Sequence, residues 1–350
     1  MKRRKTKKIM VGKVAVGEFS KISIQSMLKL PSEDIIGNVK QALDLEKEGC
    51  DILRVAIPNK NALKLIYAIK KEIKIPLVAD IHFDYRLAVE SVFAGADKVR
   101  INPGNIGGVA CVKEIVKACV FKNIPIRVGV NSGSLPKSIL KKYSTPNVNA
   151  LCDSVISSVN ILEKLNFDKI IVSVKSSNVM NTIEAYEFLS QKIEYPLHLG
   201  VTEAGSETQG VLKSSCAIGS LLTRGIGDTI RVTLTDEPKK EIDVAKELLA
   251  VLGMKKNGIE IISCPTCGRT KVDLMDFTKK VKNHFKDSKK NIKLALMGCA
   301  VNGPGEASEA DLGVAFGENE GIIFKNGKIL KKVSYNYIFE ELVKVADDFV

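Results

Sequence analysis

Three cysteines in the last quarter of the chain have the residue type and spacing of metal ligands. Cys264 and Cys267 form a C-x-x-C pair in the turn CPTCG, and Cys299 lies in GCAVNGPGE. A structural zinc site prefers four such ligands, and His284 is the only histidine in this region. Three thiolates that leave one iron open, or bound to oxygen, suit a 4Fe–4S cluster. The spacing favours a cluster and leaves zinc, or a simple dithiol pair, as alternatives.

A second set of reactive side chains ends short apolar runs in the first two thirds of the chain. Five of them are cations: Arg54, Arg100, Arg127, Lys175 and Arg231. The others are polar or acidic: Asp80, His82, Asn102, Asn131, Glu203 and Thr233. Arginine binds phosphate oxygens through a planar fork, and lysine adds a point charge. We therefore predict a site for a ligand with two or more phosphate charges.

Other interpretations apply to parts of this set. The arginines could instead form salt bridges at the strand ends with Asp80, Glu203 and Asp228. His82, beside Asp80, is a candidate acid/base or phosphate contact. Glu203 is a candidate proton donor or orienting carboxylate.

Eight short, almost continuously apolar runs must position these residues. They cover residues 22–27, 51–57, 76–82, 97–102, 125–131, 169–175, 196–202 and 228–234. Runs of this kind are typical of parallel strands buried on both faces, and amphipathic stretches separate them. Eight strand–helix units predict a (β/α)8 TIM barrel, whose active site lies at the carboxyl ends of the strands. We expect an ordered loop over residues 132–147. A Rossmann-type sheet is the alternative, but no G-x-G-x-x-G follows the first strand.

The pattern changes after Gly253. Two strand-like segments, GIEIISC and NIKLALMGC, flank a predicted helix near residues 271–287, and Asn326-Gly327 predicts a type I′ hairpin. A final helix is expected near residues 336–347. We therefore predict an α/β protein with a barrel domain over residues 1–255 for substrate, followed by a smaller α+β iron–sulfur domain over residues 256–350.

Composition limits the class of protein. The 350 residues are 45% hydrophobic and 27% charged with a net charge of +13, which is typical of a globular enzyme. No apolar run is long enough to cross a bilayer, and the basic N-terminus lacks the features of a secretory signal, so we expect a cytoplasmic protein. No nucleic-acid motif is present, and the charge suits an anionic small molecule together with an acidic protein partner. The remaining cysteines are expected to pack as small apolar residues.

Five motifs resemble those of the bacterial 4-hydroxy-3-methylbut-2-enyl diphosphate synthases. They are VADIHF (78–83), RINPGNIG (100–107), LGVTEAG (199–205), IISCPTCGR (261–269) and GCAVNGPGE (298–306). The resemblance runs from about residue 9 to the C-terminus and keeps the order of all motifs. Two departures are Thr233, where the family often has serine, and Phe316, where a small residue is common.

The resemblance implies a ligand set and a reaction. It implies that Cys264, Cys267, Cys299 and Glu306 bind a 4Fe–4S cluster, and that Asn302 lies beside the substrate. It also implies that the polar strand-end residues bind the diphosphate, and that Glu203 assists proton transfer. The implied reaction is the reductive opening and dehydration of 2-C-methyl-D-erythritol 2,4-cyclodiphosphate, with electrons from flavodoxin or ferredoxin. The resemblance further implies a homodimer whose active site is shared between chains. The rival is a non-redox phosphate-ester barrel enzyme with a structural zinc module.

Overall fold

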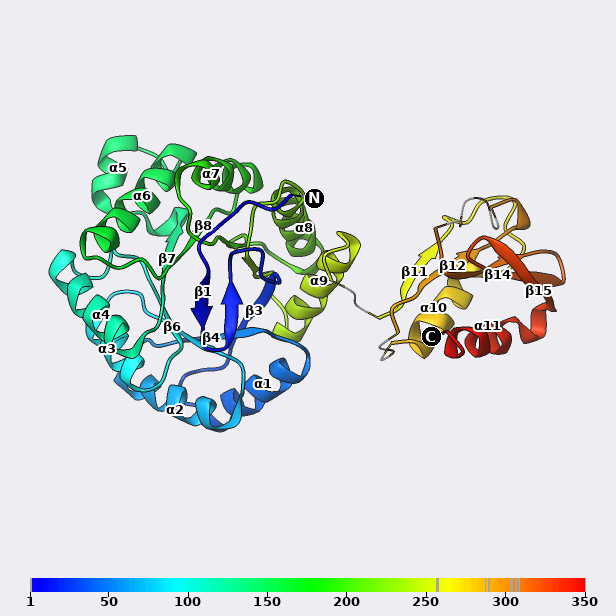
Figure 1. The fold of residues 1–350 in the computed structure, drawn as a ribbon, viewed down its shortest axis with the longest axis horizontal. Helices are drawn as coiled ribbons and strands as arrows, with labels where there is room; N and C mark the ends of the chain where they lie inside the picture. Colours follow the sequence, from blue (N-terminus) through cyan, green and yellow to red (C-terminus); the bar gives the residue numbers. More distant parts are fainter. Residues whose placement is uncertain are drawn as a thin grey trace. The chain divides into compact units, whose positions relative to one another are not determined.

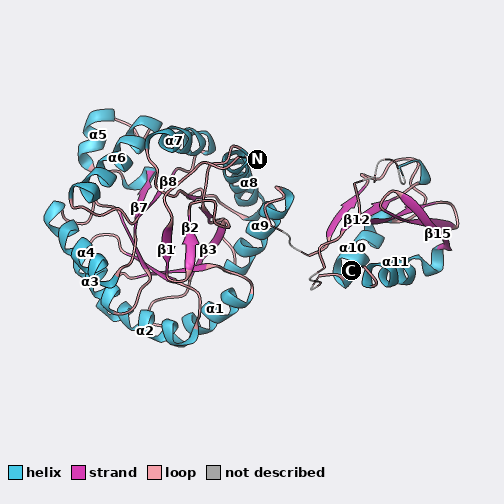
Figure 2. Ribbon diagram, viewed as in Figure 1, coloured by secondary structure: helices cyan, strands magenta, loops and turns pink. Residues whose placement is uncertain are grey.

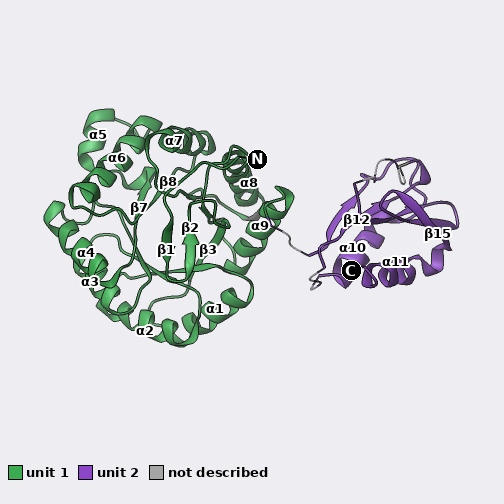
Figure 3. Cartoon of the chain, in the orientation of Figure 1, with its two compact units in different colours: residues 1–254 green, residues 255–350 purple. Residues whose placement is uncertain are grey.

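The computed structural model describes residues 2–255, 258–286, 288, 290–302, 305, 307 and 309–349, with the backbone alone at residues 207 and 302. The chain divides into two compact units, residues 1–254 and residues 255–350 (Figure 3). Each unit has its own apolar core and is described separately. None of the described helices is both long and apolar enough to cross a membrane.

Unit 1 is a parallel eight-stranded barrel, as predicted (Figures 1 and 2). Its strands are β3 Ser23–Met27, β4 Ile52–Ala56, β5 Leu77–Asp80, β6 Lys98–Ile101, β7 Ile126–Asn131, β8 Ile170–Lys175, β9 His198–Leu199 and β10 Thr229–Ile230. Hydrogen bonds run in the order β8-β7-β6-β5-β4-β3-β10-β9. A parallel bridge between Val172 and Leu197 joins the two ends and nearly closes the barrel. Each of the eight predicted strands is present, although β9 and β10 are short.

An outer ring of helices buries the strands (Figure 2). They are α1 Ile35–Lys47, α2 Leu63–Glu72, α3 Tyr85–Phe93, α4 Val109–Lys122, α5 Lys137–Tyr143, α6 Val148–Lys164, α7 Val179–Lys192, α8 Glu207–Thr223 and α9 Pro238–Val251, with short 3-10 turns η1 Lys60–Ala62 and η2 Ser132–Ser134. Helix α1 shows the pattern. The Asp34 carboxylate accepts the Gly37 N–H at 2.8 Å, and Asn38, Ala42 and Leu45 form its buried stripe.

The segment predicted as an ordered loop, residues 132–147, is partly helical. It contains η2 and α5, and the Pro136 carbonyl accepts the N–H groups of Ile139 and Leu140. Proline just before a helix fixes a suitable φ and lacks an N–H that would remain unpaired. Ile139 and Leu140 pack against the barrel core, and this tertiary contact stabilises a helix too short to form alone.

A two-stranded hairpin, β1 Ile9–Val11 and β2 Val14–Val16, was not predicted from the sequence. Its apolar residues Ile9, Val11 and Val16 pack against Ile52, Val78 and Ile171. These three lie near the amino ends of β4, β5 and β8, so the hairpin covers the floor of the barrel. It crosses the barrel in Figure 1.

The basic N-terminus is ordered in part. Arg4 donates to the carbonyls of Ser190, Ile193 and Tyr195 at 2.9, 2.5 and 2.6 Å. Arg3 donates to Asp228 at 3.2 Å. These arginines therefore tie the start of the chain to the segments that precede β9 and β10.

The registers assign the polar strand residues to the barrel interior. Alternate strand residues share a face, and so do residues that pair between parallel strands. Because Ile52, Val78 and Ile171 face the floor hairpin, residues at the same phase on every strand face inward. Each layer of a barrel takes one side chain from every second strand. From the floor upward, the layers are Ile52, Lys98, Ile171 and Thr229; then Gln25, Val78, Arg127 and His198; then Arg54, Arg100, Ser173 and Arg231; then Met27, Asp80, Gly129 and Gly200.

Unit 2 is a five-stranded mixed sheet with helices on one face. Its elements are β11 Glu260–Ser263, α10 Leu274–His284, β12 Lys293–Met297, η3 Ala300–Asn302, β13 Leu312–Phe316, β14 Glu320–Lys325, β15 Lys328–Ser334, η4 Tyr335–Tyr337 and α11 Ile338–Asp347. Strands β11, β12 and β13 are parallel, and β13–β14–β15 is antiparallel. Asn326 and Gly327 have φ of 48° and 71°, as the predicted type I′ turn requires.

Candidate active site

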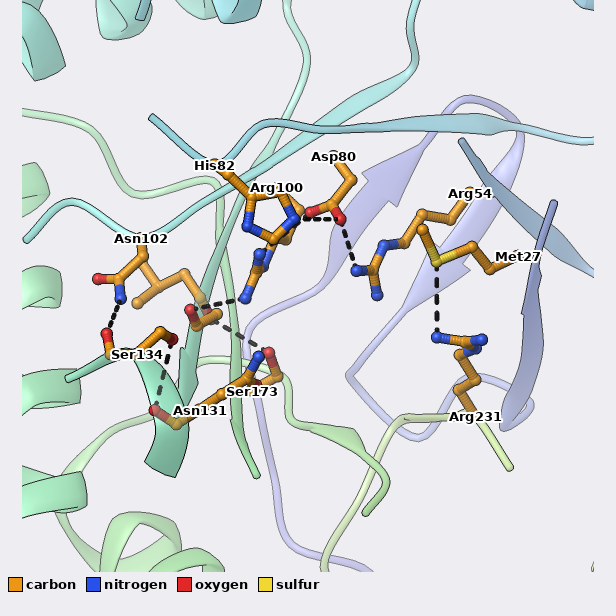
Figure 4. Close-up of polar contacts among 12 residues, drawn as sticks. Met27, Arg54, Asp80, His82, Arg100, Asn102, Asn131, Ser134, Ser173 and Arg231 are labelled. Atoms are coloured by element: carbon orange, nitrogen blue, oxygen red, sulfur yellow. Dashed lines mark hydrogen bonds and ion pairs between the residues drawn. The ribbon is translucent and has the colours of Figure 1, made fainter. Parts of the chain in front are cut away.

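The carboxylate of Asp80, at the end of β5, organises the interior of the barrel (Figure 4). It accepts Arg54 Nη2 at 2.6 Å and Arg100 Nη1 at 3.2 Å, and His82 Nε2 lies 3.2 Å away. Burial raises its pKa, but the charge of Arg54, the His82 hydrogen bond and the charge of Arg100 outweigh burial and hold the pKa well below the ordinary value. Asp80 is therefore ionised and fixes two guanidinium groups.

Glycine makes room for one of these arginines. Arg100 Nη2 also donates to the Gly129 carbonyl at 3.1 Å. A Cβ at residue 129 would lie 2.4 Å from Arg100 Nε, too close for two non-bonded atoms. The absence of a side chain at Gly129 thus allows Arg100 to lie across β7.

A second buried carboxylate, Glu241 of α9, holds Arg231. Arg231 Nη2 donates to Glu241 at 3.4 Å. Its Nη1 lies 3.6 Å from Met27 Sδ (Figure 4). Glu241 also accepts Lys29 Nζ at 2.9 Å and the Leu234 N–H at 3.1 Å. The helix after β10 therefore positions the last cation of the barrel, and the sequence did not indicate this role.

Arg127 and Lys175 have no such partner. Within the described residues neither forms an ion pair, and Arg127 Nε and Nη1 have no hydrogen-bond partner. Arg127 is 1% exposed and Lys175 7%. Burial first, and then the neighbouring arginines, lower the pKa of both groups well below the ordinary values. Uncompensated buried cations of this kind are expected where an anion binds.

The predicted site residues lie in two regions, the interior of the barrel and its mouth at the carboxyl ends of the strands. Arg127, predicted at a strand end, is the second residue of β7 and lies deep in the interior. Asn102, buried, donates to the Ser134 carbonyl at 3.2 Å, and Ser134 donates to the Asn131 carbonyl at 3.4 Å (Figure 4). Glu203 is exposed with a φ of 52°, and its carboxylate faces Gly133. Thr233 is half-buried.

The alternative of strand-end salt bridges holds only in part. Arg54 and Arg100 share Asp80, but Arg231 pairs with Glu241 rather than with Glu203 or Asp228. Asp228 is instead bound by Arg3 at the amino end of β10, the end opposite the mouth. Two carboxylates do not neutralise the five cations, so the interior keeps a positive excess.

Three buried polar residues of the barrel were missed. Gln25, Lys98 and His198 are each at most 1% exposed, and each has a side-chain nitrogen without a partner among the described residues. Each of the three shares the inward face of the barrel with a predicted site residue. That site residue lies two positions later on the same strand, or in phase on a neighbouring strand. Reading alternate residues, instead of strand ends alone, would have found them.

The cysteine motifs lie at the carboxyl end of the sheet in unit 2. Cys264 follows β11, and Cys299 follows its parallel neighbour β12 by two residues. The Gly298 N–H donates to Cys264 Sγ at 3.2 Å. Cys267 sits in an exposed turn, closed by the Thr270 hydroxyl that accepts the Cys267 N–H at 3.0 Å.

The predicted ligand set is only partly visible. Among the described residues no group of three Cys, His, Asp or Glu side chains is placed to hold a metal ion. A zinc site formed by these cysteines would require their sulfurs to lie within about 4 Å of each other, because each Zn–S bond is about 2.3 Å long. Glu306 lies outside the described residues, and so does the side chain of Asn302.

The chain is similar to a known family over nearly all its length. The model of the GcpE TIM-barrel domain matches residues 6–246, and that of the GcpE protein C-terminal domain matches residues 260–348. A protein of Clostridium perfringens is 53% identical over 347 residues, which cover 99% of each chain. One of Fusobacterium nucleatum is 53% identical over 345 residues, covering 99% of this chain and 98% of its own. Both are named 4-hydroxy-3-methylbut-2-en-1-yl diphosphate synthase (flavodoxin).

Solved structures that resemble the chain are far more distant in sequence. Dihydropteroate synthase of Stenotrophomonas maltophilia superposes with a TM-score of 0.51 at 12% identity, over 71% of this chain and 99% of its own. N-acetylneuraminic acid synthetase of Leptospira borgpetersenii does so with a TM-score of 0.50 at 12% identity, over 82% of this chain and 100% of its own. At this identity the likeness shows the fold alone.

Proposed function

Because this chain belongs to the GcpE family of 4-hydroxy-3-methylbut-2-en-1-yl diphosphate synthases, we propose that its barrel binds 2-C-methyl-D-erythritol 2,4-cyclodiphosphate and that its second unit carries a 4Fe–4S cluster. The enzyme is an oxidoreductase of isoprenoid biosynthesis that makes 4-hydroxy-3-methylbut-2-enyl diphosphate. The observation that carries the substrate assignment is the excess of cations inside the barrel.

The cation set suits a cyclic diphosphate. Arg54 and Arg100 are held in place by Asp80, and Arg231 by Glu241, so these three forks are oriented before a ligand arrives. Such preorganised donors bind oxyanions without further reordering. Arg127 and Lys175 supply charge that no described carboxylate cancels. We therefore assign the diphosphate to this set, with Asn102, Asn131 and Thr233 at the mouth.

The donor set of unit 2 suits the proposed cluster. Cys264 and Cys299 end neighbouring strands, and Cys267 extends from the turn between them and α10. The N–H···S bond from Gly298 is a contact that stabilises cluster-bound thiolates. We propose that these three cysteines and Glu306 hold the cluster, with Asn302 near the substrate. When bound, the cluster would supply electrons one at a time.

The reaction balances with two electrons and two protons. The bond between the tertiary carbon and its phosphate oxygen breaks, the diphosphate remains on the primary carbon, and a hydroxyl leaves as water. The barrel cations stabilise charge on the released phosphate oxygen. Glu203 and His82, the latter with 55% of its side chain exposed, are the residues at the mouth that we propose to move protons.

The electron donor and the assembly are proposed on the basis of the family. The names of the relatives include flavodoxin, which we propose as the donor, with ferredoxin as an alternative one-electron carrier. We also propose that two chains associate and share active sites, so that the cluster of one chain serves the barrel of its partner.

Anaerobic purification and turnover test the proposal. Wild-type protein should be brown, hold about four irons per chain, and convert the cyclodiphosphate when a strong reductant is supplied. Cys299→Ser should lose turnover and lose or degrade the cluster, whereas Cys216→Ala, an exposed cysteine on α8, should keep both. Colourless protein with one zinc per chain would support the zinc alternative. Full activity of Cys299→Ser would contradict the ligand assignment.

A further inference from the structure

Lys98 is a cation that the proposed binding set does not include. It is the first residue of β6 and pairs in register with Val78, which packs against the floor hairpin inside the barrel. Its side chain therefore starts in the lowest interior layer. It is 0% exposed, and its Nζ has no hydrogen-bond partner among the described residues.

The charged groups around Lys98 are mostly cations. Arg127 of β7 and Arg54 of β4 act directly on its charge. His198 of β9 is buried, and its Nε2 has no hydrogen-bond partner among the described residues. The charges of Arg127, Lys175 and Lys98 act on its ring. The other described charged residues around this interior are Asp80, Arg100, Lys175, Arg231 and Glu241. Asp80 already binds Arg54 and Arg100, and Glu241 binds Arg231, so neither described carboxylate is left as a counter-ion for Lys98.

We propose that Lys98 forms the floor of the anion site, where its ammonium and the Arg127 guanidinium together bind the innermost oxygens of the diphosphate. This inference rests on the proposed function and adds one residue to the proposed binding set. Both groups have unpartnered N–H donors, and each is fully buried. An anion between them offsets their repulsion and satisfies those donors, as the burial of polar groups requires.

Binding is then coupled to protonation of the lysine. In the empty barrel, burial first and then Arg127 and Arg54 lower the Lys98 pKa well below its ordinary value, because each disfavours the charged form. A bound dianion favours the ammonium and raises that pKa. Binding therefore takes up protons, and affinity falls as the pH rises from the pKa of the empty site toward that of the occupied site.

Calorimetry of the anaerobic full-length protein tests this inference. Inorganic diphosphate and then the cyclodiphosphate are titrated in two buffers of different ionisation enthalpy, which gives both affinity and proton uptake. Lys98→Met removes the charge and keeps the stem of the side chain. It should bind about tenfold more weakly, as expected for one lost charged hydrogen bond, and take up fewer protons. Without ligand it should melt at a higher temperature, because an apolar group replaces a buried amine that has no hydrogen-bond partner among the described residues.

The control is Lys113→Met, which removes the same charge from the exposed surface of α4 and should match wild type in all three measurements. If Lys98→Met does not fold, Lys98→Gln replaces it in the same three measurements. If either Lys98 variant keeps wild-type proton uptake, with or without a loss of affinity, the inference is wrong and the proposed function stands. If wild-type protein binds neither anion, the barrel-site proposal itself is wrong.

Discussion

At the scale of single residues, Asp80 shows how one anion can organise a site for another. A carboxylate with two arginines leaves a net positive charge, and its contacts fix the direction of both guanidinium groups. Glu241 does the same for Arg231 from a different element. The cations that bind a diphosphate are thus held by carboxylates that do not themselves face solvent, since their side chains are 0% and 1% exposed.

Replacement of the organising carboxylate should be costly. Asp80→Asn leaves two buried guanidinium groups without a counter-ion, and we expect the free energy of unfolding to fall by about 3–5 kcal/mol. Chemical denaturation at pH 7 measures this change. Asp243→Asn, on the exposed side of α9, should change stability by no more than about 0.5 kcal/mol. Equal stabilities of the two variants would show that the Asp80 contacts add little.

The same variant has a defined pH dependence. The folded-state pKa of Asp80 lies below the unfolded value of about 3.9. Its contribution to stability is therefore complete well above pH 4 and is lost as the pH falls toward the folded-state pKa. The stability difference between wild type and Asp80→Asn should shrink as the pH is lowered below about 4. A difference that stays constant from pH 7 to pH 3 would contradict this assignment.

At the scale of elements, the barrel strands combine outward apolar residues with inward polar residues. Val99 and Ile101 of β6 are buried against the helices, while Lys98 and Arg100 face the interior. The apolar half of this pattern makes the strands predictable, because short apolar runs recur between amphipathic stretches. The depth of an inward residue was not predictable. It depends on the register with neighbouring strands, which is why Arg127 was expected at the mouth and Lys98 was overlooked.

Other elements were missed for different physical reasons. Strands β1 and β2 have three residues each, too few for an alternating pattern to stand out, and they are stabilised by contacts with distant strands. Helix α5 depends on packing against the barrel core rather than on its own propensity. Glu241 lies on α9 and contacts Arg231 of the preceding strand segment, and this pairing depends on how the chain turns from β10 into α9 rather than on a strand-end pattern.

Gly129, in the layer above the inward-facing arginines, gives a test at this scale. In Gly129→Ala the new methyl group must displace Arg100, whose Nε would be 2.4 Å away. We expect the affinity for inorganic diphosphate to fall about tenfold, as for one lost charged hydrogen bond. Gly219→Ala is the matched control, because its Cβ would meet only Leu248 at 3.7 Å, an ordinary contact. An unchanged affinity in Gly129→Ala would mean that the position of Arg100 does not matter for binding.

At the scale of the whole molecule, substrate and cluster residues are assigned to units with separate cores. The apolar cluster of unit 1 involves the barrel strands and their helices, and that of unit 2 involves α10, α11 and the five-stranded sheet. Among the described residues, none belongs to both clusters. The proposed substrate site and the proposed cluster site therefore depend on different sets of packing contacts.

This separation predicts that the barrel can be studied alone. Residues 1–254, expressed without unit 2, should unfold cooperatively and bind inorganic diphosphate, yet hold no iron. Thermal unfolding with increasing diphosphate should show a rising midpoint, since the ligand binds only the folded state. A truncated chain that is unfolded, or that binds iron at the wild-type ratio, would contradict the division.

The floor hairpin has a consequence for how the chain is completed during synthesis. Residues 2–17 leave the ribosome before the strands on which they pack, because Arg3 binds Asp228, 225 positions later, and the hairpin packs on strands as late as β8. At cellular elongation rates of about 5–20 residues per second, this segment waits on the order of ten seconds or more for its partners. During that time Ile9, Val11 and Val16, almost fully buried in the finished protein, are open to other chains and to chaperones. This segment, though made before the barrel strands, is therefore among the last parts of unit 1 to complete its contacts.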